Sequence, residues 1–149
     1  MHESTEELQK QKANLWVPQT LLMEAEILGQ ANEYKRAHRL LNEAQALIEP
    51  LDQRFYEAEL HRVRGVVMLS QNPGSEDGMA HLDRAIDVAQ RQNSRFLHLR
   101  ACVSKARRAL DQGRRDEART ILAAPYAAFS EGLDTVDLVE ARTLLDALH

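Results

Sequence analysis

Apolar residues recur every three or four positions along most of the chain, which is the period of an amphipathic helix. The pattern is clear in EYKRAHRLLNEAQALI, residues 33–48, where the apolar positions form a single stripe. Pro50 ends this stretch, and SQNPGSEDG, residues 70–78, is the sharpest break in the sequence. The pattern predicts seven helices and no strands. Their predicted ranges are 18–28, 33–48, 51–69, 76–90, 94–112, 114–129 and 136–148.

Residue types that favour helix ends mark several of these boundaries. Pro18 suits the first turn of a helix, where its missing N–H costs no hydrogen bond. Asn32 and Ser75 are predicted N-caps, because their side chains can accept hydrogen bonds from free amides of the first turn. Gly113 is predicted to end a helix in a left-handed turn, and Pro125 is predicted to kink one.

One short helical pattern occurs three times, as AHRLLNEA, GMAHLDRA and ARTILAAP. Small residues recur in phase with it at separations of 40 or 41 positions. They are Ala37, Gly78 and Ala118 in these segments, and Ala25, Gly65 and Ala106 in the helix before each. A small side chain lets two helices approach closely, and two series with one period are typical of a repeat array whose units share a core.

These observations predict an all-α protein with a single domain. We expect an α-solenoid of about three antiparallel helix pairs, with a C-terminal capping helix, over residues 14–149. Residues 1–13 are expected to form a disordered or frayed N-terminal segment.

The segments EYKRAHRLLNEA and GRRDEARTIL resemble the second helix of the tetratricopeptide repeat (TPR), and SEDGMAHLDRA fits with Gly78 in the Ala position. The period near 40 is longer than the roughly 34 residues of the standard unit and closer to HEAT or armadillo repeats. Those two families lack the small–Leu–Ala pattern, so the resemblance favours TPR-like helix pairs.

Residues 55–148 also resemble the C-terminal helical-repeat tail of large bacterial regulators, which carry a central ATPase module and an adenylate-cyclase or DNA-binding domain. The similarity lies in FYEAELHRVRGVVML, QGRRDEARTIL and FSEGLDTVDLVEARTLLDAL. It covers the tail alone, because the sequence has neither the GxxxxGK[ST] motif nor a cyclase-like metal-carboxylate segment. Lys105 departs from the family pattern, which usually has a leucine there.

Charge and composition argue against several function classes. The chain has 19 basic and 23 acidic residues, whereas a protein that binds duplex nucleic acid needs a basic surplus. Its single cysteine, Cys102, allows no internal disulfide and favours a reducing compartment. The sequence has no apolar run of membrane-spanning length and no signal-peptide core. We therefore expect a cytoplasmic protein that binds neither nucleic acid nor membranes.

The sequence shows no catalytic or metal-binding motif. No two histidines have H-x-x-x-H spacing, and none has zinc-finger spacing to Cys102. His61 and His98 occupy related places in two repeats, which favours a shared structural or groove-facing role over metal binding. The common hydrolase, dinucleotide and zinc-protease motifs are also absent. We expect no enzymatic activity and no cofactor.

Helical arrays present a concave surface, and in TPR-like stacks the first helix of each pair lines it. Counting from the small residues, the predicted exposed groove positions are Gln19, Leu22, Glu26, Glu59, Arg62, Val66, Arg100, Val103 and Arg107. The arginines have two interpretations, as contacts for an acidic peptide or as solubilising surface. The seven cations between Arg100 and Arg119 have the same ambiguity, as a phosphate or acidic-peptide surface or as solvated helix faces.

The leading hypothesis is a non-catalytic protein interaction module that binds a peptide or a partner domain in the groove. Charge reversal at Arg62 and Arg107 is then expected to weaken binding without lowering the melting temperature. An alternative is a sensor segment of a larger bacterial signalling or transcription regulator, which binds a small effector or packs on an ATPase module. A third hypothesis is a homodimer formed through the open ends of the stack.

Overall fold

The computed structural model describes residues 5–49, 56–131 and 135–148, and over these ranges it is all-helical, with no strand. This confirms the all-α part of the predicted fold class. The helices are α1 Thr5–Gln30, α2 Tyr34–Ile48, α3 Glu57–Gln71, α4 Glu76–Arg91, α5 Arg95–Asp111, α6 Arg115–Ala127 and α7 Val136–Ala147.

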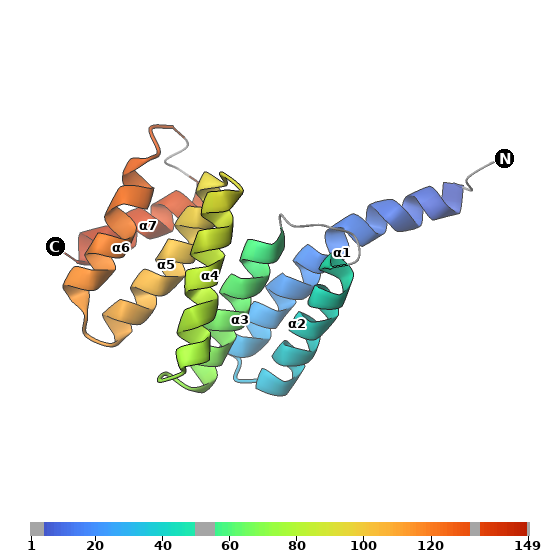
Figure 1. The fold of residues 1–149 in the computed structure, drawn as a ribbon, viewed down its shortest axis with the longest axis horizontal. Coiled ribbons are helices and arrows are strands. Elements are labelled where there is room, and N and C mark those ends of the chain that lie inside the picture. Colours follow the sequence, from blue (N-terminus) through green and yellow to red (C-terminus); the bar gives the residue numbers. More distant parts are fainter. Residues whose placement is uncertain (1–4, 50–55, 132–134, 149) are drawn as a thin grey trace.

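Consecutive helices lie side by side (Figure 1). Helix α1 packs against α2, α3 against α4, and α5 against α6. Helices α1, α3 and α5 also contact one another in that order, so they join the successive pairs, and α7 packs against both α5 and α6. This order brings residues from α1, α3, α5 and α7 to one side of the molecule.

Helices α3 and α4 approach each other closely at Gly65 and Gly78. A Cβ atom on Gly65 would lie 2.8 Å from the carbonyl oxygen of Gly78, and one on Gly78 would lie 2.8 Å from Leu69 Cγ. Both distances are shorter than real Cβ contacts, so this crossing excludes any larger side chain. Two of the phased small residues therefore meet directly.

The other four phased residues are alanines that are fully buried in the core. Ala25 and Ala37 belong to a cluster built by α1, α2 and α3, and Ala106 and Ala118 belong to one built mainly by α5, α6 and α7. Cys102 lies in the second cluster, where burial raises the pKa of its thiol to about 11. The cysteine is thus a buried filler that stays protonated.

Several predicted helix ends are confirmed. Ser75 caps α4, because its Oγ accepts a hydrogen bond of 3.0 Å from the amide of Gly78. Gly113 follows α5 with a φ of 78°, the left-handed conformation predicted for it. The amide of Leu97 donates to Ser94 Oγ at 3.3 Å, so a serine also caps α5.

Two predicted boundaries are wrong. Helix α1 begins at Thr5 rather than at Pro18, which lies inside it. The residues before Pro18 contain no other helix breaker, and a helix can continue through a proline at the loss of a hydrogen bond. Asn32 does not cap α2, whose N-cap is Glu33. Asn32 has a φ of 63° and ends α1 instead, a conformation that asparagine tolerates better than most residues.

The first part of α1 projects away from the other helices (Figure 1). Helix α1 includes residues 5–13 of the segment that was expected to be disordered or frayed, while residues 1–4 lie outside the described residues. Pro125 lies inside α6, near its C-terminal end.

Candidate functional site

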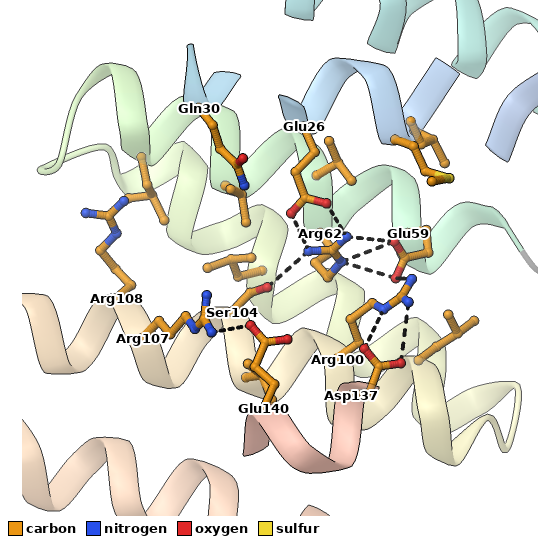
Figure 2. A pocket seen from close by; sticks show the side chains of 18 of the residues that line it. Glu26, Gln30, Glu59, Arg62, Arg100, Ser104, Arg107, Arg108, Asp137 and Glu140 are labelled. Atoms are coloured by element: carbon orange, nitrogen blue, oxygen red, sulfur yellow. Dashed lines mark hydrogen bonds and ion pairs between the residues drawn. The ribbon is translucent and has the colours of Figure 1, made fainter. Parts of the chain in front are cut away.

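A groove of about 790 Å³ runs along α1, α3, α5 and the start of α7 (Figure 2). All nine residues predicted from the sequence line it, so the spacing of the small residues brings together side chains from three helices. The nine residues are Gln19, Leu22, Glu26, Glu59, Arg62, Val66, Arg100, Val103 and Arg107.

Only Gln19 and Arg107 are exposed as predicted, and four of the other seven residues are half-buried: Glu26, Glu59, Val66 and Arg100. The remaining three are buried. Leu22, Val103 and Arg62 keep only 3%, 5% and 7% of their surface accessible. They form the floor of the groove, where side chains from α1, α3 and α5 converge. Counting along a helix gives the face on which a residue lies, but not how deeply its neighbours cover it.

Arg62 connects the three helices that form the floor (Figure 2). Its Nη1 and Nη2 atoms donate to the two carboxylate oxygens of Glu26 in α1, both at 2.9 Å. Its Nε and Nη2 atoms donate to Glu59 in α3 at 3.0 to 3.1 Å. Nη1 also donates to Ser104 Oγ in α5 at 3.3 Å. All three guanidinium nitrogens of Arg62 therefore donate hydrogen bonds to neighbouring side chains.

These contacts outweigh the cost of burial for both charges. Burial by itself would raise the pKa of Glu26, but the hydrogen bonds and the charge of Arg62 hold it below its ordinary value. Burial by itself would lower the pKa of Arg62, but Glu26 and Glu59 raise it. Both groups therefore stay ionised in the folded protein at neutral pH.

The network continues to α7 through Arg100 (Figure 2). Arg100 lies 3.4 Å from Glu59 Oε1 and donates to the two oxygens of Asp137 at 3.3 and 3.4 Å. Arg107 makes a further ion pair with Glu140 in α7. Asp137 and Glu140 are not predicted from the sequence, because α7 was expected only to cap the stack and has no phased small residue.

Each groove arginine therefore has carboxylate partners in the folded chain. An acidic peptide would compete with these carboxylates for Arg62, Arg100 and Arg107. Charge reversal at Arg62 would place a further negative charge beside Glu26 and Glu59 in a buried site. It is expected to destabilise the fold, contrary to the sequence-based expectation.

Two exposed apolar side chains border this charged floor. Met23 in α1 is 59% exposed and Val136 in α7 is 81% exposed, and both line the groove. Ile27 and Val139 lie on the same two helices and are 61% and 48% exposed, but neither lines it. The groove thus combines the buried charge network of Arg62 with exposed apolar side chains that can bury themselves against a ligand.

Three other residues singled out in the sequence, His61, His98 and Lys105, lie outside the groove. His61 contacts His81, with their Nδ1 atoms 3.0 Å apart, and neither His61 nor His98 faces the groove. Lys105 Nζ lies 2.7 Å from Asp83 Oδ1, so the polar residue in place of the usual leucine links α5 to α4. In the run of cations that follows, Arg114 pairs with Glu117 at 2.7 Å.

Comparison with protein-family models, with curated proteins and with solved structures finds no significant match. Within the described part of the chain, no three histidine, cysteine or acidic side chains converge in a way that could hold a metal ion. None of the described helices has an apolar stretch long enough to cross a membrane. The functional interpretation therefore rests on the geometry of the groove.

Proposed function

We propose that this protein is a non-catalytic interaction module whose groove binds a peptide segment of a partner protein. The proposal includes a TPR-like solenoid of three helix pairs, with α7 as the cap. Two features support the solenoid. Helices α1, α3 and α5 line the groove, as the first helices of TPR-like pairs do, and the phased small residues are buried or in contact.

The observation that carries the binding proposal is the combination of Met23 and Val136 with the network around Arg62. Exposed apolar side chains on a groove provide the hydrophobic contribution to peptide binding. The contacts of Arg62 with α1, α3 and α5 hold the floor in place before a ligand arrives, which lowers the entropic cost of binding.

The chemistry of the groove favours a peptide with apolar anchor residues. The groove arginines are already paired with carboxylates, whereas Met23 and Val136 are largely exposed. Acidic residues of the partner then have a secondary role. The exposed amides of Gln19 and Gln30 can hydrogen-bond to the backbone of an extended peptide.

The test is selection of peptides from a displayed random library on the purified protein. Selected peptides should contain apolar anchors and should bind at least tenfold more weakly to the Met23→Glu and Val136→Glu variants, since a charge would be buried in each contact. Ile27→Glu and Val139→Glu are matched controls on the same helices, with comparable exposure but outside the groove.

All four positions are exposed, so each variant should keep the circular dichroism spectrum and melting temperature of the parent protein. If the peptides bind all four variants equally, the groove is not the binding site. The same conclusion follows if only Ile27→Glu and Val139→Glu lose peptide binding. Failure to enrich any peptide would contradict the proposed function.

The size of the groove also favours a second candidate function. Its volume of about 790 Å³ lies within the range of roughly 300 to 1,000 Å³ that small-molecule sites occupy. The domain would then be the sensor segment of a larger cytoplasmic bacterial regulator that binds a small effector. A metabolite library screened by thermal shift tests this. A compound that raises the melting temperature of Met23→Glu and Val136→Glu as much as that of the parent protein would favour an effector bound at the floor.

A further inference from the structure

A second cavity, of about 480 Å³, lies on another part of the molecule, where α2, α3 and α4 meet. It shares no lining residue with the groove. Its charged and polar lining residues are Gln45, Glu49, Glu57, His61, Arg64, His81 and Arg84. The cavity is therefore a site separate from the groove.

The sequence H-x-x-R occurs in both α3 and α4, as HRVR at 61–64 and HLDR at 81–84. The two histidines stack, with ring centroids 5.2 Å apart and an interplanar angle of 21°. His61 contacts His81, and four positions later in α3 Gly65 contacts Gly78, which comes earlier in α4. The two helices are therefore antiparallel. Each arginine is one helical turn after its histidine, so the two arginines flank the histidine pair on opposite sides.

Neither arginine has an acidic partner among the described residues. Arg64 donates only to neutral oxygens, at 2.8 Å to Gln45 Oε1, 3.3 Å to Asn42 Oδ1 and 3.5 Å to the carbonyl of Leu41. Arg84 makes no hydrogen bond or ion pair to the described part of the chain. Burial of Arg64 lowers its pKa, which is the effect of removing a cation from water without a counter-ion. A bound anion would supply that counter-ion.

The histidines lie in the positive field of these arginines. Burial lowers the pKa of His61 to about 4, with smaller contributions from the charges of His81, Arg84 and Arg64. Burial and Arg64 likewise lower the pKa of His81, although Asp77 acts in the opposite direction. Both rings are therefore neutral at pH 7, and their Nδ1 atoms share one hydrogen bond. A bound anion would favour their protonation.

Two carboxylates also border the cavity and oppose an anion. Glu57 lies 4.0 Å from His61 Nε2, and Glu49 accepts a hydrogen bond of 2.9 Å from Gln45. When both histidines are neutral, the charges of the two arginines and the two glutamates cancel. Protonation of His61 and His81 makes the cavity positive.

We propose that this cavity binds a small ligand with a diphosphate group, whose oxygens contact Arg64 and Arg84 on either side of the histidine pair. Two separated cations suit an elongated anion with charge at both ends. The cavity has room for the diphosphate and a modest organic group attached to it.

The test is calorimetric titration of the whole chain with inorganic pyrophosphate at constant ionic strength. Arg84→Gln should bind about tenfold more weakly, since one charged hydrogen-bond donor is lost. Glu57→Gln should bind more tightly, because an opposing charge is removed. Arg91→Gln is the matched control, because Arg91 is on the same helix, pairs with Asp87 and does not line the cavity.

A second series uses sulfate, whose charge stays constant between pH 7.5 and 5.5. Sulfate affinity should rise as the pH falls, and this dependence should disappear in His61→Leu/His81→Leu. Titration with ADP identifies the source of the diphosphate: tighter binding than pyrophosphate indicates a nucleotide, and equal binding indicates the inorganic anion. Pyrophosphate that does not bind at millimolar concentration, or that binds parent, Arg84→Gln and Glu57→Gln equally, would overturn the proposal.

Discussion

Replacement of Arg62 by methionine is the most informative test of the network beneath the groove. Methionine keeps the stem of the side chain to about the position of Nε but removes the charge and all the hydrogen bonds to Glu26, Glu59 and Ser104. Two acidic groups, 27% and 13% exposed, are then left without their main counter-charge.

Breaking a buried ion pair by removal of one partner costs about 3 to 5 kcal/mol, and the partial exposure of Glu26 favours the lower end. In a chain of 149 residues, 1 kcal/mol shifts the melting temperature by about 2 to 4 °C, so a fall of roughly 6 to 20 °C is expected. Urea unfolding followed by circular dichroism at the helix band measures the free energy directly. Arg91→Met, which breaks the exposed pair with Asp87, should change stability by less than about 0.5 kcal/mol.

The pH dependence separates an electrostatic cause from simple loss of packing. In the parent protein the pKa of Glu26 is lowered, so its stabilising contribution is present above pH 4.5 and is lost as the pH falls. In Arg62→Met the effect of burial is opposed only by the smaller effects of the Arg100 and Arg107 charges, and the pKa of Glu26 should rise. The destabilisation should therefore shrink between pH 7 and pH 5.

A triple variant completes this test. Glu26→Gln and Glu59→Gln, added to Arg62→Met, should recover at least about 1 kcal/mol at pH 7, because no uncompensated charge is left in the floor. A loss below 1 kcal/mol in the single variant, independent of pH and not rescued by the glutamines, would refute the electrostatic role of Arg62.

Three further predictions concern the helix contacts. Gly78→Ala should cost about 1 to 3 kcal/mol in urea unfolding, because its Cβ would lie 2.8 Å from Leu69 Cγ, whereas Gly74→Ala, 3.7 Å from its nearest neighbour, should change little. The pKa of His61 falls from 6.5 unfolded to about 4 folded, so up to about 3 kcal/mol of stability should be present above pH 6.5 and lost on acidification toward pH 4; His61→Leu should flatten this profile. Ser75→Ala should lower stability by about 1 kcal/mol, since the α4 cap is lost, and an unchanged midpoint would contradict the capping role.

The sequence predicts the helices well where local signals are strong. Ser75 and Gly113 act as predicted because capping and left-handed turns depend on residues close in the chain. Pro18 and Asn32 are misleading because each residue type suits two positions. A proline can start a helix or lie inside one, and an asparagine can start a helix or end one.

The candidate groove shows the limit of the same reasoning. A count from Ala25, Gly65 and Ala106 places the residues that line it, since helical geometry repeats regularly. It does not give the contact between Arg62 and Glu26, which are 36 positions apart, or the part played by Asp137. These depend on the distances between helices and on how deeply each side chain is covered, and both arise only once the chain is folded.

The contact of Gly65 with Gly78 has a mechanical consequence. Because backbone meets backbone there, α3 and α4 cannot slide or roll against each other without separating, and they move as one rigid body. Any change in curvature of the molecule must then occur at the boundaries between pairs. Arg62 crosses these boundaries on the groove side, from α3 to α1 and to α5. The width of the groove is accordingly set by charged side chains, while the thickness of the central helix pair is set by two glycines.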